Sequence, residues 1–452
     1  MDINTVFVLV MFATFILCLF SGYPMVFVLG GVAVLFAFAG EIANTYFDIW
    51  LDADLSFLKL AVRRIFSTVS SYSLIPLPLF IFMGLMLDRS DIARELLDAM
   101  QEALVRLPGG LAISVTAIGV VLAASTGIIG ASVVLLASLA LPSMLEARYS
   151  KSLATGVVAA SGTLGILIPP SIMLIVMADQ LALSVGDLFM AALLPGLVLA
   201  ALYFVFVIAF AFIFPSHAPR GGAPASGRDR IAAVLRILKA LMPPVLLIFS
   251  VLGSIFFGIA SPTEAAGVGA AGATLLAWIK RRLDFETLRD VCYSTAKTTA
   301  FILGALVGAT TFAVVLRGLG GDEVIDQTIL SLPFGPEGTV LAILGIVFLL
   351  GFVLDWIEIA MIVLPLVASS VAALGFDLVW FAILVAVCMQ TSFLTPPVGF
   401  ALFFVKSASP PSVSMIDVYK GVVPFVLLQL VGLALVFAFP ELALWLPSIV
   451  YQ

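Results

Sequence analysis

Apolar side chains fill long uninterrupted stretches of this chain, whereas polar and charged side chains collect in the short segments between them. A helix that crosses a bilayer core needs about 20 mainly apolar residues. The pattern therefore predicts roughly ten crossings of this kind, near residues 5–20, 24–40, 72–87, 152–181, 188–214, 241–258, 262–279, 298–316, 378–405 and 418–440.

Two further apolar blocks, near residues 110–145 and 338–374, carry small or polar residues in their middle. Each block is long enough for two short helices, so we expect re-entrant helical hairpins that enter and leave on the same side of the membrane. Three charged stretches with helical spacing, 52–70, 92–107 and 284–297, are expected to lie along the membrane interface. Polar loops are the alternative for each of them.

The distribution of Lys and Arg predicts the orientation of the chain. With a periplasmic N-terminus, the expected crossings leave only Lys59, Arg63, Arg64 and Arg317 of the 21 basic residues on the outer face. The remaining basic residues, including those of the linker 215–240, then lie in the cytoplasm. Because Lys59 is the first basic residue, we expect no cationic signal peptide, and the first apolar stretch should remain in the membrane.

Composition narrows the functional class. With 63% hydrophobic and 11% charged residues, the chain is not a set of soluble domains. The single histidine, His217, lies in a Pro-, Gly- and Ser-rich linker, and the three cysteines are far apart in the sequence. Neither pattern matches the nucleophile, base or metal constellation of an intramembrane enzyme. We therefore expect a transporter subunit that is not an enzyme and needs no organic cofactor.

Sequence landmarks recur in the same order in both halves of the chain. The pair Pro396–Pro397 follows the pair Pro169–Pro170 by 227 positions. Three further landmarks, Pro24, Pro142 and Asp187, correspond in order to Pro262, Pro365 and Asp417. Each half contains five expected crossings and one hairpin, and because five is odd, the second half must be inverted. We expect a first inverted repeat over 1–214, a cytoplasmic basic linker over 215–240 and a second repeat over 241–452.

The double prolines mark the expected transport chemistry. Proline removes a backbone donor and breaks or kinks a helix, which frees carbonyl groups inside the membrane. The polar segments 161–165 and 390–395 precede the two pairs and add hydroxyl groups. Uncharged oxygen ligands of this kind suit sodium, although small residues also serve close helix packing.

The two hairpin turns carry different side chains. The first turn, 125–132, offers hydroxyls and helix N-terminal amides that suit a carboxylate. The second turn carries two acids, Asp355 and Glu358, and acids inside a membrane are costly and usually functional. A turn that lies near the water interface would lower that cost.

Several of these segments together resemble the large membrane subunit of tripartite ATP-independent periplasmic (TRAP) transporters, in particular the mannitol/chloroaromatic-type branch. They are LDRS at 87–90, ASTGIIG at 124–130, SGTLG at 161–165 with IPPS at 168–171, SPTEAA at 261–266 and FLTPPVG at 393–399. The resemblance covers essentially the whole chain. It implies an all-α polytopic inner-membrane protein with two inverted repeats and the elevator-type architecture of the ion-transporter superfamily.

The resemblance also implies a function and partners. The expected activity is sodium-coupled import of small organic acids, such as C4-dicarboxylates, keto or hydroxy acids or aromatic carboxylates. The expected partners are a small four-helix membrane subunit and a periplasmic substrate-binding protein. A stand-alone ion-coupled organic-anion transporter without a binding protein is the alternative.

By the same resemblance, residues of the hairpin turns and helix breaks are expected to form the binding sites. The expected cation ligands are Ser125, Thr126, Gly130, Gly162, Thr163, Gly165, Gly351, Thr391, Thr395 and Pro396. The expected substrate ligands are Ser125, Gly127, Ser132, Ser161, Pro170, Asp355, Ser392, Pro397 and Gly399. Because there are two helix breaks, one in each repeat, we expect two sodium ions.

Overall fold

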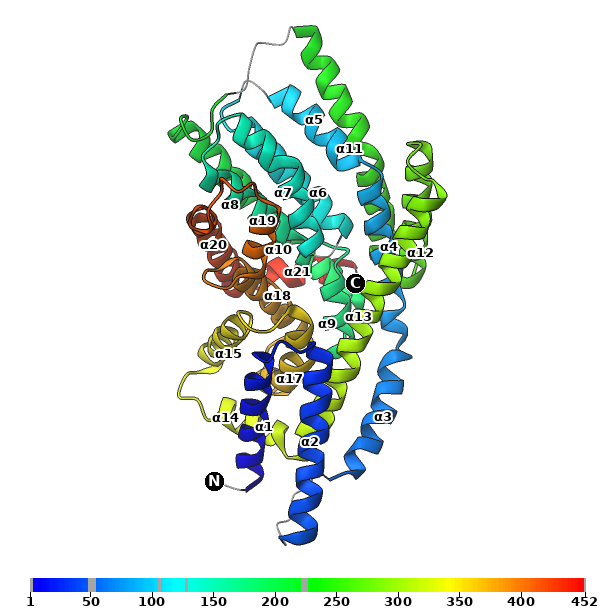
Figure 1. The fold of residues 1–452 in the computed structure, drawn as a ribbon, viewed down its shortest axis with the longest axis vertical. Coiled ribbons are helices and arrows are strands. Elements are labelled where there is room, and N and C mark those ends of the chain that lie inside the picture. The colour runs from blue at the N-terminus through cyan, green and yellow to red at the C-terminus, as the bar shows by residue number, and fades with distance from the viewer. Residues whose placement is uncertain (1–2, 48–53, 105–106, 127–128, 221–226, 451–452) are drawn as a thin grey trace. The chain divides into compact units, whose positions relative to one another are not determined.

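The computed structural model describes residues 3–47, 54–104, 107–126, 129–220 and 227–450, and every regular element within these ranges is helical (Figure 1). The prediction of an all-α polytopic protein is therefore confirmed for the described part of the chain. Eight described helices are long and apolar enough to cross a membrane. Two of these eight, Ile129–Glu146 and Trp356–Ala373, are the second arms of the expected hairpins, and several expected crossings consist of shorter helices.

Contacts within the chain divide it into two compact units. The first unit comprises Met1–Leu74, Val176–Leu183 and Lys297–Phe381, and the second comprises Ile75–Ile175, Ser184–Ala296 and Ala382–Gln452. Three helices contribute residues to both units: α9 (Ile172–Gln180), α13 (Phe285–Gly318) and α18 (Leu378–Leu394).

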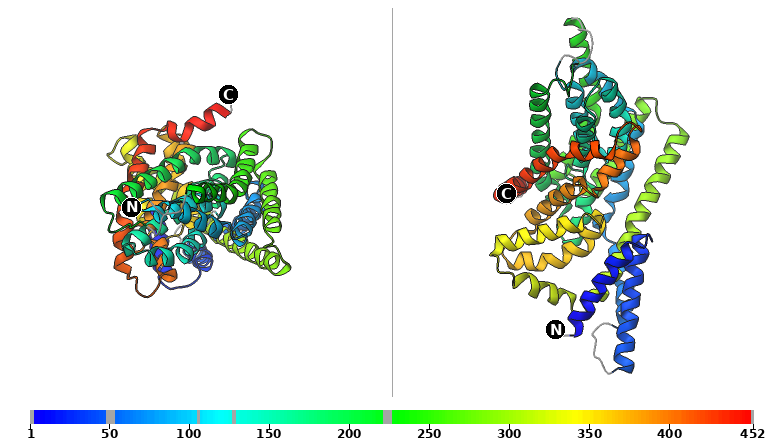
Figure 2. Two further views of the ribbon diagram at one scale, coloured as in Figure 1. Left: turned by 90° about the horizontal axis from the view of Figure 1, so that it is seen from above. Right: turned by 60° about the vertical axis from the view of Figure 1, so that its left-hand side comes forward.

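The first unit contains the N-terminal helices and the second expected hairpin. Its further elements are α1 (Ile3–Leu19), α2 (Met25–Tyr46), α3 (Ser56–Val69), η1 (Tyr72–Leu74), α14 (Gly321–Leu330), α15 (Pro336–Leu350), α16 (Trp356–Glu358), η3 (Ile359–Val363) and α17 (Leu364–Ala373). Helices α1 and α2 lie side by side (Figure 2). The Phe312 ring of α13 contacts Phe12 and Phe15 of α1, with ring centroids 5.9 and 5.1 Å apart. These apolar contacts attach α1 to the unit.

The second hairpin has an irregular returning arm. Helix α15 ends at Leu350, and the chain resumes at α16 after a short turn. The segment Ile359–Val363 is a π-helix, and Pro365 follows it after one intervening residue, Leu364. Because Pro365 has no backbone N–H, it cannot continue the regular hydrogen-bond ladder, and a wide turn accommodates this loss.

The second unit contains the first hairpin and both double prolines. Its further elements are α4 (Pro76–Arg89), α5 (Ile92–Leu104), α6 (Gly110–Thr126), α7 (Ile129–Glu146), α8 (Lys151–Thr163), η2 (Leu164–Ile166), α10 (Val185–Ile213), α11 (Gly227–Phe256), α12 (Pro262–Ile279), α19 (Phe400–Ala408), α20 (Met415–Ala438) and α21 (Glu441–Val450). Several of these helices begin at serines whose side chains accept a backbone N–H: Ser150, Ser184, Ser261 and Ser414. Such caps satisfy donors that a helix start leaves open.

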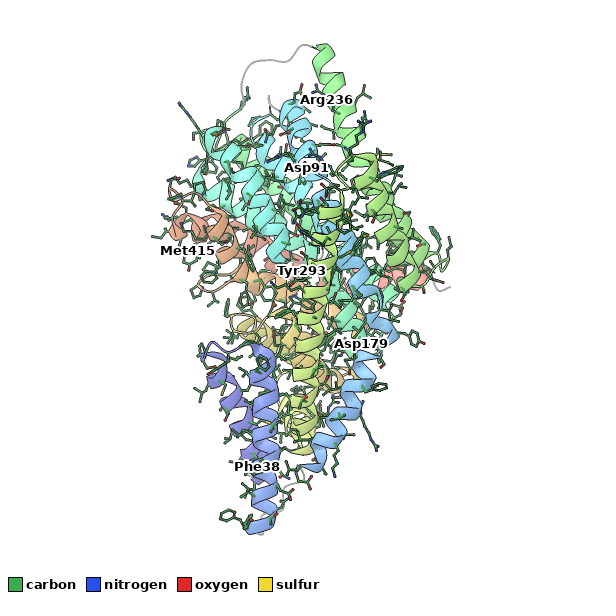
Figure 3. The ribbon with its side chains drawn as sticks, turned by 45° about the vertical axis from the view of Figure 1, so that its right-hand side comes forward. Phe38, Asp91, Asp179, Arg236, Tyr293 and Met415 are labelled. Carbon is green, nitrogen blue, oxygen red and sulfur yellow. The ribbon has the colours of Figure 1, made fainter. Side chains whose placement is uncertain are left out.

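Ion pairs attach the amphipathic helix α5 within the second unit. Arg282 pairs with Asp91, in the turn before α5, at 2.8 Å, and Arg236 of α11 pairs with Glu102 at 2.8 Å. Figure 3 labels Asp91 and Arg236. Lys280 also pairs with Glu95. The basic residues expected on the cytoplasmic face therefore also hold α5 beside α11 and the end of α12.

Three elements differ from the expected pattern. The stretch 284–297, expected as a separate interfacial segment, forms one continuous helix with the following crossing, α13. No glycine or proline interrupts this helix before Gly304, so nothing in the sequence ends it earlier. Helices α14 and α21 were not expected; both begin with acidic residues in their first turn, a typical signal of a helix start.

Candidate functional site

Both double prolines interrupt helices, as expected. Helix α8 ends at Thr163 and continues as a short 3-10 turn, and α9 begins only at Ile172, beyond Pro169–Pro170. Helix α18 ends at Leu394, and α19 begins at Phe400, beyond Pro396–Pro397. The Pro–Pro bond is cis in both pairs. The prediction of broken helices is confirmed at both positions.

The first hairpin packs directly against the end of α8. A side chain at Gly162 would bring its Cβ within 2.5 Å of Val133 Cγ2 on α7. A side chain at Gly119 of α6 would bring its Cβ within 2.4 Å of Ser161 Cβ. Glycine at these two positions therefore permits the close contact between the hairpin and the polar end of α8.

The two helix breaks meet within the second unit. The Gln390 side chain of α18 donates from Nε2 to Thr163 Oγ1 of α8 at 3.4 Å. Both side chains are fully buried. The first hairpin also contacts the segment beyond the second break, because a Cβ at Gly130 would lie 3.0 Å from the Phe404 ring of α19. The hairpin and both breaks therefore form one continuous region of the second unit.

This region contains buried polar atoms that lack hydrogen-bond partners in the described part of the chain. They are Ser161 Oγ, Tyr203 OH, Gln390 Oε1, and both Oε1 and Nε2 of Gln429. The Tyr203 hydroxyl lies beside the side chains of Gln429, Thr163 and Gln390 without a well-formed bond to any of them. An unpartnered buried polar group costs about 1–3 kcal/mol. This group of unpartnered atoms makes the region the candidate site.

The threonine hydroxyls of the two breaks donate to backbone carbonyls of their own helices. Thr163 donates to the Ala160 carbonyl at 2.9 Å, Thr391 to Val387 at 2.8 Å and Thr395 to Thr391 at 2.7 Å. A hydroxyl that has given its proton away presents only lone pairs to its surroundings. Such oxygens are suitable ligands for a hard cation such as sodium.

The tip of the second hairpin carries a half-buried acid, Asp355, and a buried acid, Glu358, in the first unit. The Asp355 carboxylate accepts the Trp356 backbone N–H at 2.8 Å and so caps α16. Glu358 is 3% exposed, and its Oε2 has no hydrogen-bond partner among the described residues. Gly351 caps the end of α15. Because Thr395 belongs to the second unit, the expected joint site of the second tip and the second break remains a prediction.

The other expected ligands occupy varied positions. Gly127 lies outside the described residues, and the structure describes Ser125 and Thr126 only as the backbone end of α6. Ser132, Ser392, Gly165 and Pro170 are buried. The exposed Pro397 accepts the Tyr419 hydroxyl at its carbonyl (2.9 Å), and Pro396 is half-buried. Gly399 precedes α19 with φ +23°, a backbone conformation that favours glycine.

Sequence reasoning missed Tyr203 and Gln429 as members of the cluster. Each is the only strongly polar residue of an otherwise apolar stretch, 188–214 and 421–439 respectively. A lone polar residue within a membrane helix is itself a signal of function or of a polar contact. That signal was available in the sequence.

Comparisons with known proteins agree with the resemblance noted in the sequence. Residues 12–442 match the family model described as "Tripartite ATP-independent periplasmic transporter, DctM component". The ectoine/5-hydroxyectoine TRAP transporter large permease protein UehC of Ruegeria pomeroyi is 30% identical over 98% of this chain and 99% of its own. The C4-dicarboxylate TRAP transporter large permease protein DctM of Pseudomonas aeruginosa is 29% identical over 86% of this chain and 89% of its own.

Among solved structures, the crystal structure of the Alcanivorax borkumensis YdaH transporter superposes with a TM-score of 0.58. It covers 84% of this chain and 89% of its own at 14% sequence identity. At this identity the similarity concerns the fold alone.

Proposed function

The chain belongs to the DctM component family of tripartite ATP-independent periplasmic transporters, and we propose that it is the large permease subunit of a sodium-coupled importer of small organic acids. Family membership makes it a transporter subunit rather than an enzyme, and a multi-pass protein of the bacterial inner membrane. The coupling ion, the substrate class and the transport mechanism are the proposed part.

The observation that carries the proposal is the contact between the two helix breaks at Thr163 and Gln390. Around this contact lie buried oxygens that lack partners in the described chain, Ser161 Oγ and Gln390 Oε1 among them. All of these groups are uncharged. Neutral hydroxyl and carbonyl oxygens fit sodium, which gains their lone pairs without the cost of burying a carboxylate.

The same contact supports two inverted repeats, 1–214 and 241–452, joined by the linker 215–240. Thr163 and Gln390 are 227 positions apart, the same spacing as Pro169 and Pro396. Equivalent residues of two repeats touch each other only near a two-fold axis that relates the repeats. Sites on such an axis suit alternating access, and we infer an elevator-type movement of the region that carries them.

A small carboxylate is the proposed substrate. The relatives of this chain include permeases named for C4-dicarboxylates, which are small organic acids. In the proposed site, the serine hydroxyls of the first hairpin and of the two breaks donate to the carboxylate, and glycine and proline positions leave space for it. Asp355 at the tip of the second hairpin accepts hydrogen bonds but repels an anion, so it suits a donor group and not a second carboxylate.

Two partners complete the proposed transporter. One is a small membrane subunit with four helices, and the other is a periplasmic protein that delivers the substrate. A relative from Oleidesulfovibrio alaskensis is named as an isethionate TRAP transporter permease protein DctMQ, and this chain spans 59% of it. That relative therefore extends beyond the region that this chain matches.

Two coupling ions are energetically sufficient for accumulation. One positive charge that moves inward across ~100 mV releases about 2.3 kcal/mol. When two sodium ions enter with one monoanion, the net charge that moves inward is one positive charge. The membrane potential then supplies about 2.3 kcal/mol, enough for roughly 50-fold accumulation of the anion. The sodium concentration gradient adds to this value.

The proposal is tested by uptake in proteoliposomes that hold this chain, the small subunit and the cognate binding protein. We expect uptake only with an inward sodium gradient, and faster uptake when the interior is negative. Transport that is independent of sodium, or equally fast without the binding protein, would contradict the proposal; the second result would favour a stand-alone anion transporter.

A further inference from the structure

Tyr203 and Gln429 lie in the apolar core of the second unit, where an ordinary membrane helix would carry leucine or phenylalanine. Both side chains are fully buried. The Tyr203 ring of α10 packs edge-on against Phe425 of α20, with centroids 5.3 Å apart and an interplanar angle of 86°. This packing fixes the ring, and with it the position of the hydroxyl.

The polar ends of these two side chains face the contact between the breaks. The Tyr203 hydroxyl lies beside Gln429, Gln390 and Thr163. Among the residues the structure describes, Tyr203 OH, Gln390 Oε1 and the whole Gln429 amide have no well-formed hydrogen bond. The cluster therefore holds more donors and acceptors than its present bonds use.

The bond from Gln390 to Thr163 competes with cation binding. Gln390 Nε2 donates to Thr163 Oγ1, while Thr163 itself donates to the Ala160 carbonyl. The threonine oxygen has two lone pairs, and the amide N–H occupies one of them. A cation at Thr163 would also repel the positive end of the N–H dipole. The amide must then donate elsewhere, because an unmade bond in this dry core is costly.

We propose that Tyr203 and Gln429 are positioning residues that accept the Gln390 amide when a cation binds at Thr163. In this state the amide of Gln390 donates to the Tyr203 hydroxyl, which donates in turn to Gln429 Oε1. The chain of bonds frees the Thr163 oxygen and lowers the cost of ion binding. The inference rests on the proposed sodium coupling and adds two residues that do not touch the ion.

The bond chain predicts a specific change in sodium affinity. Tyr203→Phe removes the middle link, and Gln429→Met removes the last one at similar volume. Each substitution should raise the sodium concentration for half-maximal uptake by about three- to tenfold, the value of one hydrogen bond, with a smaller change in maximal rate. The double variant should equal the more affected single variant, since either loss breaks the same chain.

Phe189→Leu provides the matched control, because Phe189 is as fully buried as Tyr203 on the same helix α10 but packs against Phe80 of α4, with ring centroids 6.0 Å apart. It should leave the half-saturating sodium concentration unchanged. A second readout is the rise in the unfolding midpoint of the purified complex on addition of sodium without substrate. This rise should be smaller for Tyr203→Phe and Gln429→Met than for the natural protein and the control.

The outcomes separate this inference from the proposed function. If the natural protein shows no sodium dependence, the proposed function fails. If it depends on sodium and both variants keep the natural half-saturation, only the positioning role is refuted. Additive effects in the double variant, or an equal shift in Phe189→Leu, would also refute the bond chain. Should Tyr203→Phe yield no folded complex, Gln429→Met tests the same chain.

Discussion

At the scale of single residues, the threonines of the two breaks are not equivalent. Thr163 is fully buried and bonded to Gln390 of the other break. Thr395 is half-buried, and its hydroxyl bonds to its own helix at the Thr391 carbonyl. A fully buried oxygen acts on a cation with less screening by water than a half-buried one, so Thr163 should contribute more to an ion site.

Replacement of these threonines by valine should weaken sodium dependence. Valine has the same shape but no oxygen ligand, so we expect a rise in half-saturating sodium of about tenfold for Thr163→Val, or ~1.4 kcal/mol, and a smaller rise for Thr395→Val. Uptake at varied sodium concentration measures this. Thr116→Val is the control, because Thr116 is equally buried and donates to the Ala112 carbonyl of its own helix at 3.0 Å. Unchanged sodium affinity in both break variants would remove the threonines from the site.

The acids of the second hairpin tip should matter through their charge. Asn can cap a helix as Asp does, so Asp355→Asn should fold normally. We nevertheless expect at least a tenfold loss of uptake, about 1.4 kcal/mol, because an acid within an apolar membrane segment is costly and is usually retained for function. Glu358→Gln should have a smaller effect. Asp377→Asn is the control, since Asp377 is exposed and caps α18 through the Val379 N–H at 2.7 Å. Equal activity of Asp355→Asn and this control would argue against a role for Asp355.

Residue positions were more predictable than residue partners. Proline chemistry alone predicts that helices end near residues 169 and 396, and both do. The sequence does not reveal that Gln390 reaches Thr163, because this contact depends on how helices 227 positions apart pack. Tyr203 and Gln429 were missed for the same reason: their meaning depends on which polar groups they face.

At the scale of helices, the second unit is held by a very close crossing of α8 and α20. A Cβ at Gly156 would lie 2.1 Å from the Gly421 carbonyl oxygen. A Cβ at Gly421 would lie 2.0 Å from the Ser152 carbonyl oxygen. Because neither glycine has a side chain, the two helix backbones approach each other closely. Dispersion attraction between the backbones then stabilises the crossing. The crossing therefore fixes α8, which carries the first break, against α20, which carries Gln429.

A methyl group at this crossing should force the helices apart. Gly156→Ala should destabilise the protein by about 1–3 kcal/mol, the usual cost of overpacking, and thermal unfolding of the purified protein should show a lower midpoint. Gly267→Ala in α12 is the control, because a Cβ there meets nothing within 4 Å. That change should be neutral or stabilise by up to about 1 kcal/mol through helix propensity. Equal midpoints for the two variants would show that the crossing tolerates separation.

Helix boundaries followed the sequence where breakers or caps were present. Helix α12 begins at Pro262 and ends at Ile279, as expected, because Ser261 and Glu264 form a capping box at its start. Helix α13 was misjudged because its charged first turns resembled a surface helix, whereas nothing in the sequence separates them from the apolar turns that follow. A change in hydropathy along the sequence therefore marks a change of environment, and it does not mark the end of a helix.

At the scale of the whole chain, the sequence was sufficient for the class of protein and for its family. A long apolar pattern with few charges permits only a membrane protein, and in lipid only helices or a closed barrel satisfy every backbone group. The inverted arrangement of the two repeats remains a prediction, because it rests on the parity of the crossings and on charge asymmetry.

Inversion predicts that the two hairpins open toward opposite sides of the membrane. The first hairpin ends near Arg148, on the predicted cytoplasmic side, and the second ends near Ala373, on the predicted periplasmic side; both residues are exposed. In a variant whose natural cysteines Cys18, Cys292 and Cys388 are replaced by serine or alanine, single cysteines at these two positions report the side directly. A membrane-impermeant maleimide should label Ala373→Cys in intact spheroplasts and Arg148→Cys only after permeabilisation. Labelling of both from the same side would mean that the repeats are parallel, and the shared axis inferred from Thr163 and Gln390 would then be lost.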